Sequence, residues 1–421
     1  MNMWLLVFVT VIFLICTDCT RRNVCPTYLD YFTINTNEKC WYDVAADSDA
    51  PTIIRSHGFP LEIHRVLTPD QYILTMFRIP NAHGRKEPIF LQHGFFLSGA
   101  CFVGLGNLSL GLTLANEGYD VWIGNFRGTS YSNKHAILKS EDIQYWNFNS
   151  DHLGLHDVPT MLKYIARKTG QAGRIIYIGH SLGTTTFLEY GSRFPDQVKN
   201  LVKLAILMAP NGGMQNTKAF FFRIGVLFTD VIRLVTHTEM TKLFTPRGIL
   251  KVITKLCRAS PTLMEYCIRV INLTTLGPQK ETDASVAPIV FNQFPEASSL
   301  KVYQQIAAET VDDFRAYDYG SRNFFVYGQL KPPIYNVSKI EVPIYLIYSK
   351  RDWCTTSKDA EILFGRLHPR AKIYGRYELS DFNHNDFLYS KHAKSVVYDK
   401  ILNLIDSART LELIGSDVNE K

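Results

Sequence analysis

One pentapeptide, GHSLG at positions 179–183, constrains the fold of this chain more than any other feature. It follows an apolar run at 175–178, typical of a buried strand, and precedes a segment at 184–190, typical of a helix. A Gly-x-Ser-x-Gly sequence between a strand and a helix predicts a sharp turn that exposes the serine. The flanking glycines permit the turn, because a side chain there would collide with the adjacent strand or helix. Ser181 is therefore the candidate nucleophile, and the alternative is an ordinary glycine-rich turn.

A candidate acid follows a late predicted strand. A serine hydroxyl becomes a strong nucleophile only when a base removes its proton, and an acid must orient that base. With a serine presented in this way, the acid and then the histidine come later in the chain. The apolar run 342–348 predicts a strand, and Asp352 follows it in a short loop. Asp352 is our candidate, and Asp359 is the alternative, further on in what reads as the next helix.

The candidate base should lie in a loop after the last strand, which we expect at 373–379. His384, in the segment FNHNDF, fits this place. His368 precedes the predicted strand, and His392 adjoins the last predicted helix at 394–408, so both fit less well. His384 therefore completes the candidate triad.

Two backbone N–H groups must also stabilise the oxyanion that forms when the serine attacks a carbonyl. One belongs to the residue after the nucleophile, Leu182. The other should come from the loop after an early strand, predicted at 87–92, and we assign it to Phe95. Gly94 precedes Phe95 and lets the backbone come close to the reacting atoms.

Predicted strands and helices alternate from residue 87 to residue 208, which indicates an α/β fold with a mostly parallel sheet and helices on both faces. The alternation stops near residue 209, and a helical segment rich in aromatic residues follows until the sheet resumes at 342. We therefore predict a core in two parts, at 20–212 and 336–409, with an inserted helical cap at 213–335. A tail follows at 410–421.

The first residues predict a secretory route. The apolar run at 4–16 is too short to span a bilayer and has the length of a signal-peptide h-region, although no Lys or Arg precedes it. We predict a signal peptide at 1–19 and no transmembrane segment; the alternative is a buried N-terminal helix. The resulting location is secreted or lysosomal. Three sequons predict N-glycosylation at Asn107, Asn272 and Asn336.

The cysteines fit an oxidising compartment. Cys257 and Cys267 are close enough in sequence to close a small loop, and so are Cys25 and Cys40. Cys101 and Cys354 are left as candidate free thiols. No Cys-x-x-Cys with a histidine partner occurs, so we expect no metal site. The net charge of +6 is modest for 421 residues and no basic block stands out, so we expect no nucleic-acid partner.

Over residues 52–407 the chain resembles the acid lipase family. Several motifs carry the resemblance: GFPLE at 58–62, LQHGF at 91–95, DVWIGNFRG at 120–128, YDYG at 317–320, PPIY at 332–335, Asp352-Trp353 and Asn383-His384. The resemblance implies an α/β-hydrolase core with a helical cap, no cofactor, and Ser181, Asp352 and His384 as the triad. It also implies a disulfide between Cys257 and Cys267. The implied activity is hydrolysis of neutral lipid esters, triacylglycerol or cholesteryl ester, at a lipid–water interface.

Departures from the family leave the substrate open. Leu182 replaces a glutamine, and Phe95 and Phe96 replace a leucine pair at the predicted oxyanion hole. One alternative function is a short-chain carboxylesterase. Another is a lipid-binding or yolk-type protein on an inactive scaffold, although such proteins usually lose a member of the triad. The apolar segment 219–234 predicts that the cap controls access of a long acyl chain, and the alternative is that it only packs on the core.

Overall fold

The computed structural model describes residues 21–81, 87–228, 231 and 249–419. The predicted signal peptide at 1–19 lies outside these residues. Among the described residues, none of the helices is both long and apolar enough to cross a membrane.

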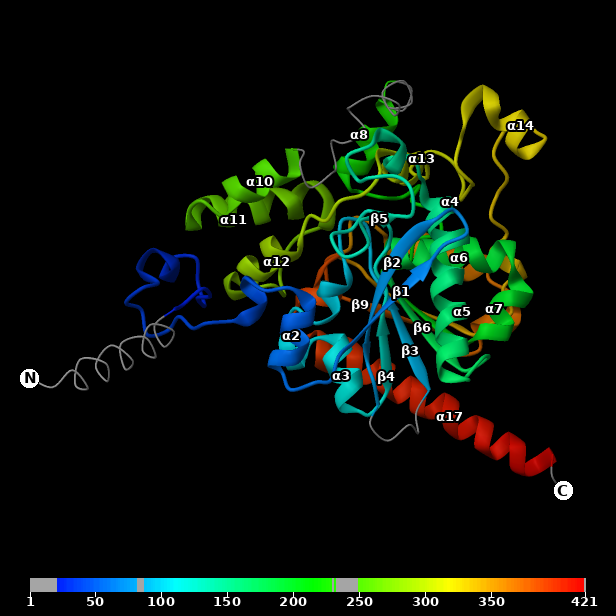
Figure 1. The fold of residues 1–421 in the computed structure, drawn as a ribbon, viewed down its shortest axis with the longest axis horizontal. Coiled ribbons are helices and arrows are strands. Elements are labelled where there is room, and N and C mark those ends of the chain that lie inside the picture. Colours follow the sequence, from blue (N-terminus) through cyan, green and yellow to red (C-terminus); the bar gives the residue numbers. More distant parts are fainter. Residues whose placement is uncertain (1–20, 82–86, 229–230, 232–248, 420–421) are drawn as a thin grey trace, which may run out of the picture.

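In the described part of the chain, nine strands form one sheet, with the order β1-β2-β4-β3-β6-β7-β8-β9 and β5 paired to β2 (Figure 1). Pairs that involve β2 are antiparallel, and all the others are parallel, as the alternation of strands and helices predicts. The strands are β1 (Glu62–Leu67), β2 (Tyr72–Ile79), β3 (Pro88–Gln92), β4 (Asp120–Ile123), β5 (Lys134–His135), β6 (Ile175–His180), β7 (Val202–Met208), β8 (Ile344–Ser349) and β9 (Arg376–Leu379).

Helices cover both faces of the sheet, because its strands are apolar on both sides. In β6, Ile176 and Ile178 pack in one hydrophobic cluster, whereas Ile175 and Tyr177 pack in the other. The first cluster includes residues of α2 (Ala50–Ser56), α3 (Leu110–Asn116), α16 (Asp386–Tyr389) and α17 (Asp399–Asn419). The second includes residues of α5 (Val158–Thr169), α6 (Leu182–Arg193), α7 (Pro195–Leu201) and α15 (Ser357–Arg366). Both predicted layers are therefore confirmed.

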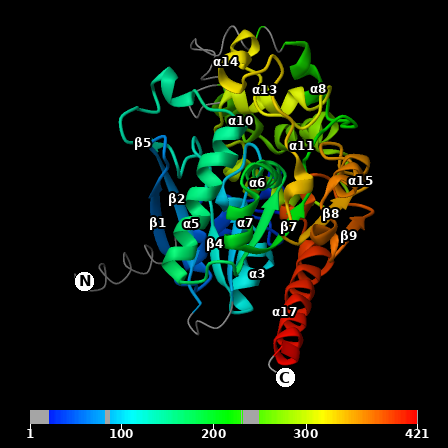
Figure 2. The same cartoon turned by 90° about the vertical axis from the view of Figure 1, so that its right-hand side faces the viewer.

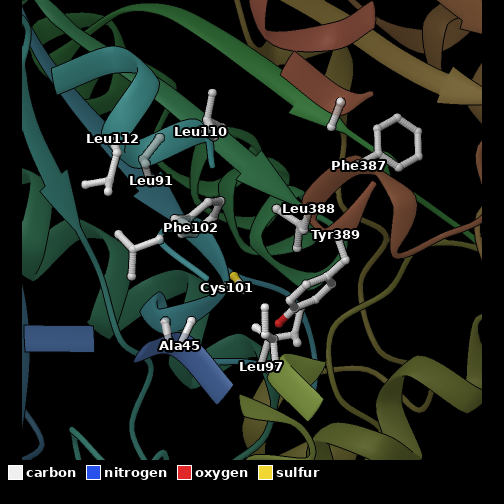
Figure 3. Close-up of a cluster of buried hydrophobic side chains, with 14 of the residues drawn as sticks. Ala45, Leu91, Leu97, Cys101, Phe102, Leu110, Leu112, Phe387, Leu388 and Tyr389 are labelled. Carbon is white, nitrogen blue, oxygen red and sulfur yellow. The ribbon is translucent and has the colours of Figure 1, made fainter. Parts of the chain in front are cut away.

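The first cluster joins distant parts of the chain. Figure 3 shows Leu91 of β3, Leu110 and Leu112 of α3, and Tyr389 of α16 around Cys101. Cys101 is a free, buried thiol, and Cys354 is another. The structure also contains the disulfides Cys25–Cys40 and Cys257–Cys267, of which the second joins two cap helices.

The cap helices that the structure describes lie between β7 and β8 in the sequence and gather at one end of the molecule (Figures 1 and 2). They are α8 (Phe220–Leu227), α10 (Ile249–Cys257), α11 (Pro261–Ile271), α12 (Ala287–Gln293), α13 (Leu300–Ala308) and α14 (Asn323–Tyr327). A π-helical turn, η8 (Asn272–Leu276), continues α11 toward the core. The domain boundaries at 213 and 335 stay predictions.

Two predicted features differ from the structure. The predicted tail at 410–421 continues α17 as helix to Asn419. The sequon residues Asn107 and Asn336 are exposed, but Asn272 is buried, with its Nδ2 donating a hydrogen bond to Gln279 Oε1 at 2.8 Å and its Oδ1 accepting one from Asn383. A glycan is attached through that same nitrogen, so we correct the predicted acceptors to Asn107 and Asn336.

Candidate active site

Ser181 lies at the turn between β6 and α6. Its φ of 52° and ψ of −119° are outside the regions that side chains favour, so the turn is strained. A Cβ on Gly179 would come within 2.8 Å of the Gly183 carbonyl oxygen, and one on Gly183 within 2.3 Å of the Gln92 carbonyl oxygen. Only glycine fits at both positions, as the sequence indicates.

Three predicted residues meet at this turn. His384 Nε2 lies 2.8 Å from Ser181 Oγ, and His384 Nδ1 lies 2.8 Å from Asp352 Oδ2. Because a carboxylate only accepts hydrogen bonds, Nδ1 carries the proton and Nε2 is free to accept one from the serine. Burial lowers the pKa of His384, but the Asp352 carboxylate outweighs burial and holds this pKa well above its usual value.

Asp352 is held in place by its own loop. Its Oδ1 accepts hydrogen bonds from the backbone N–H groups of Cys354 and Thr355 at 2.8 and 2.9 Å, and its Oδ2 accepts one from the Thr355 hydroxyl at 2.9 Å. These bonds aim one oxygen at the histidine and satisfy the buried charge.

The other candidates have different partners. Asp359 accepts hydrogen bonds from the Thr356 hydroxyl and from the backbone and side-chain nitrogens of Asn216. His368 caps a short helical turn by accepting a hydrogen bond from the Arg370 N–H. The His392 side chain is 69% exposed and pairs with a glutamate. The structure therefore brings Asp352 and His384, and none of these three, to Ser181.

The two predicted oxyanion donors flank the serine. In the described part of the chain, the N–H groups of Phe95 and Leu182 make no hydrogen bond. His93 supports the first of them: its Nδ1 donates to the Gly94 carbonyl at 2.9 Å, and its Nε2 accepts from the Phe126 N–H at 3.1 Å. Burial lowers the pKa of His93 to about 4, which keeps this ring neutral. Sequence analysis missed this role, whose only signal was the histidine before Gly94.

The loops that carry Asp352 and His384 are both bound to the cap. The Leu276 carbonyl, at the end of η8, accepts hydrogen bonds from the N–H groups of Trp353 at 3.3 Å and His384 at 3.1 Å. From the core side, His180 Nε2 donates to the His384 carbonyl at 2.9 Å. Sequence analysis also missed Leu276, because a backbone carbonyl leaves no mark in the choice of side chain.

A cavity of about 230 Å³ opens above Ser181 and His384. The core loop at 94–97 forms one wall, the loops around Ser181 and His384 form the floor, and cap residues form most of the rest, among them Phe221, Phe222 and Phe291. Most of the wall is aromatic or aliphatic, so the cavity suits an apolar chain next to a reactive hydroxyl. Among the described residues, no three His, Cys, Asp or Glu side chains gather as a metal ion requires.

Comparison with solved structures supports the same fold. An α/β hydrolase, GrgF from Penicillium sp. sh18, superposes with a TM-score of 0.51 over 83% of this chain and 99% of that chain, at 11% identity. At this identity the likeness concerns the fold alone.

Comparison with curated proteins and family models identifies relatives. Lipase member N of Homo sapiens is 30% identical over 414 residues, or 96% of this chain and 99% of that protein. Gastric triacylglycerol lipase of Bos taurus is 29% identical over 86% of this chain and 91% of that protein. The lysosomal acid lipase/cholesteryl ester hydrolase of Homo sapiens is 30% identical over 86% of this chain and 92% of that protein. Residues 50–106 match the partial alpha/beta-hydrolase lipase region, and residues 87–390 match the alpha/beta hydrolase fold. The chain therefore belongs to the acid lipase family of α/β-hydrolases.

Proposed function

We propose that this protein is a serine hydrolase that cleaves the carboxylic ester bonds of neutral lipids, triacylglycerol or cholesteryl ester. Ser181 is the nucleophile, His384 the base, Asp352 the acid, and the Phe95 and Leu182 N–H groups are the oxyanion donors. One observation carries the proposal: a chain of hydrogen bonds links aspartate, histidine and serine, and the serine lies in a cavity lined mostly by apolar side chains.

The first half of the reaction forms an acyl-enzyme. Ser181 Oγ attacks the ester carbonyl carbon while His384 Nε2 takes the hydroxyl proton, and Asp352 stabilises the imidazolium that results. The negative charge on the former carbonyl oxygen is stabilised by the Phe95 and Leu182 N–H groups. His384 then gives its proton to the oxygen of the leaving alcohol, and the carbon–oxygen bond of the ester breaks.

The second half releases the fatty acid. A water molecule attacks the acyl carbon, and His384 Nε2 takes a proton from it. The oxyanion forms again in the same place and collapses with loss of Ser181 Oγ, which recovers its proton from His384. Ester and water become alcohol and acid, and the enzyme is unchanged.

The cavity favours a long acyl chain over a short one. Burial of each CH₂ group of the substrate contributes about 0.8 kcal/mol. Phe221 and Phe222 of α8 line the cavity, while Phe220 and Leu227 of the same helix are 58% and 79% exposed. We therefore propose that the inner face of α8 contacts the acyl chain and that its outer face contacts the lipid surface. The later part of the segment 219–234 lies largely outside the described residues.

We further propose that the protein is exported or delivered to the lysosome. The disulfides Cys25–Cys40 and Cys257–Cys267 are typical of oxidising compartments, and the sequons at Asn107 and Asn336 are exposed as glycan acceptors must be. The names of the gastric and lysosomal relatives agree with this route.

One experiment tests the activity. Initial rates are measured on triolein, cholesteryl oleate and a soluble short-chain ester for the wild type, Ser181→Ala and the exposed control Ser380→Ala. We expect Ser181→Ala to lose roughly 10⁴-fold or more on every substrate, and the control to keep its rates. Activity on the soluble ester alone would identify a short-chain carboxylesterase. No activity on any ester, with retained lipid binding, would identify a lipid-binding protein.

A further inference from the structure

A second apolar surface stands apart from the mouth of the cavity. It is the α14 tip, which we define as residues 321–331, and it projects from the same end of the molecule as α8 (Figures 1 and 2). Phe324, Phe325, Val326 and Leu330 are 57%, 87%, 48% and 80% exposed. None of these four side chains lines the cavity above Ser181 and His384. Val326 lies at the edge of a separate surface depression.

The polar interior of the tip explains why its apolar residues face outward. Asn323 is buried, donates to the Asp318 carboxylate at 2.7 Å and to the Leu330 carbonyl at 2.9 Å, and accepts from the Tyr319 N–H at 2.8 Å. One turn later, the Tyr327 hydroxyl donates to the Tyr317 carbonyl at 2.8 Å. Positions i and i+4 of this one-turn helix thus face inward, and the three positions between them face solvent.

Charge distinguishes the tip from an ordinary exposed loop. Arg322 and Lys331 are both exposed, one at each end of the tip, and the sequence between them contains no Asp or Glu. Aromatic side chains beside cations suit the boundary of a lipid layer, where rings enter the headgroup region and cations meet phosphate.

We propose that the α14 tip binds the surface of an anionic lipid layer, and that it does so as a second contact beside the outer face of α8. The proposal rests on the proposed function, since a neutral lipid ester lies in a lipid phase coated by amphiphiles. Two contacts at one end of the molecule fix its orientation, so that the cavity faces the lipid. A protein partner fits less well, because a stable protein interface needs about 800 Å² on each side and this tip is a narrow projection.

The test measures binding to lipid vesicles in the Ser181→Ala background, where hydrolysis does not alter the vesicles. Vesicles of phosphatidylcholine, with and without a minor fraction of phosphatidylglycerol, are floated with each variant. We expect the double change Phe324→Ser and Phe325→Ser to weaken binding to both kinds of vesicle at least tenfold. The double change Arg322→Gln and Lys331→Gln should remove only the extra binding that phosphatidylglycerol brings. Ile373→Ser is the matched control, because Ile373 is a 63% exposed apolar residue on the α/β domain, away from the cap. This variant should bind as the parent does.

Other outcomes overturn the proposal. If the phenylalanine variant binds vesicles as tightly as its parent, α8 or another surface mediates the binding. A parent protein that binds neither kind of vesicle would also refute it, as would self-association that depends on the two phenylalanines while vesicle binding does not. Hydrolysis of a soluble short-chain ester, measured with Ser181 restored, separates the two hypotheses. It should be unchanged in every tip variant, whereas a wild type that hydrolyses no ester, soluble or emulsified, would refute the proposed function instead.

Discussion

Replacement of Glu309 by glutamine should stabilise the protein at neutral pH and leave its stability unchanged at acid pH. Glu309 follows α13 and is 2% exposed. Burial raises the pKa of its carboxyl from 4.5 to about 8; Asn211 lowers it, and the nearby Asp151 and Asp359 raise it further. The folded chain therefore holds a neutral carboxylic acid across most of the pH range of a living cell.

The sign of the effect follows from proton binding. Between pH 4.5 and about 8 the unfolded chain has lost this proton while the folded chain keeps it, so the free energy of unfolding falls as pH rises. Each pH unit costs about 1.4 kcal/mol, so the loss at pH 7 relative to pH 4.5 is about 3 kcal/mol. Glutamine mimics the neutral acid and has no proton to lose, so the variant lacks this part of the slope.

Urea unfolding followed by tryptophan fluorescence measures both proteins at pH 4.5, 6 and 7. We expect the two free energies of unfolding to agree at pH 4.5 and to differ by about 3 kcal/mol in favour of Glu309→Gln at pH 7. Glu38→Gln, at an exposed carboxyl, is the control and should follow the wild type. A difference that stays the same at all three pH values would refute the reasoning, because it would show that Glu309 does not change its charge in this range.

The remaining predictions concern the acid, the glycans and the cap. Asp352→Asn should lower kcat on a soluble ester by about 10⁴-fold, because the histidine loses its correct tautomer, while Asp359→Asn should cost far less; the reverse ranking would make Asp359 the acid. Peptide mass spectrometry of the secreted protein should find glycans on Asn107 and Asn336 and none on Asn272, and an occupied Asn272 would contradict the buried position in the structure. Leu227→Asp should slow hydrolysis of emulsified triolein and spare a soluble ester, because Leu227 is 79% exposed on α8; equal loss on both would mean that α8 is structural only.

Much of the core could be predicted because local patterns specify it. β6 and β8 are apolar over most of their length, and such strands are buried on both faces of a parallel sheet. The turn at Ser181 was equally clear, since only glycine fits on either side of it. The end of the sheet was less clear: the predicted strand at 373–379 begins only at Arg376, because Gly375 adopts a φ of 76° just before it.

Features that depend on tertiary packing could not be predicted. The sequon at Asn272 looks like any other, and only the folded chain shows that Asn383 and Gln279 occupy its polar atoms. The motif at 125–127 carried the family resemblance without an explanation. In the structure, the Phe126 N–H donates to His93, so this residue supports the loop of the predicted oxyanion donor, and the buried Arg127 pairs with the buried Asp157 and the partly exposed Asp70.

The cap contributes to the triad itself as well as to the cavity. A cover that only shields the site could move without disturbing the catalytic side chains. Here the Leu276 carbonyl receives hydrogen bonds from both loops, that of the acid through Trp353 and that of the base through His384. Because one acceptor at the end of η8 holds both loops, the distance between Asp352 and His384 depends on where the cap sits. The end of η8 is therefore part of the framework that positions the two loops, as well as part of the cavity wall.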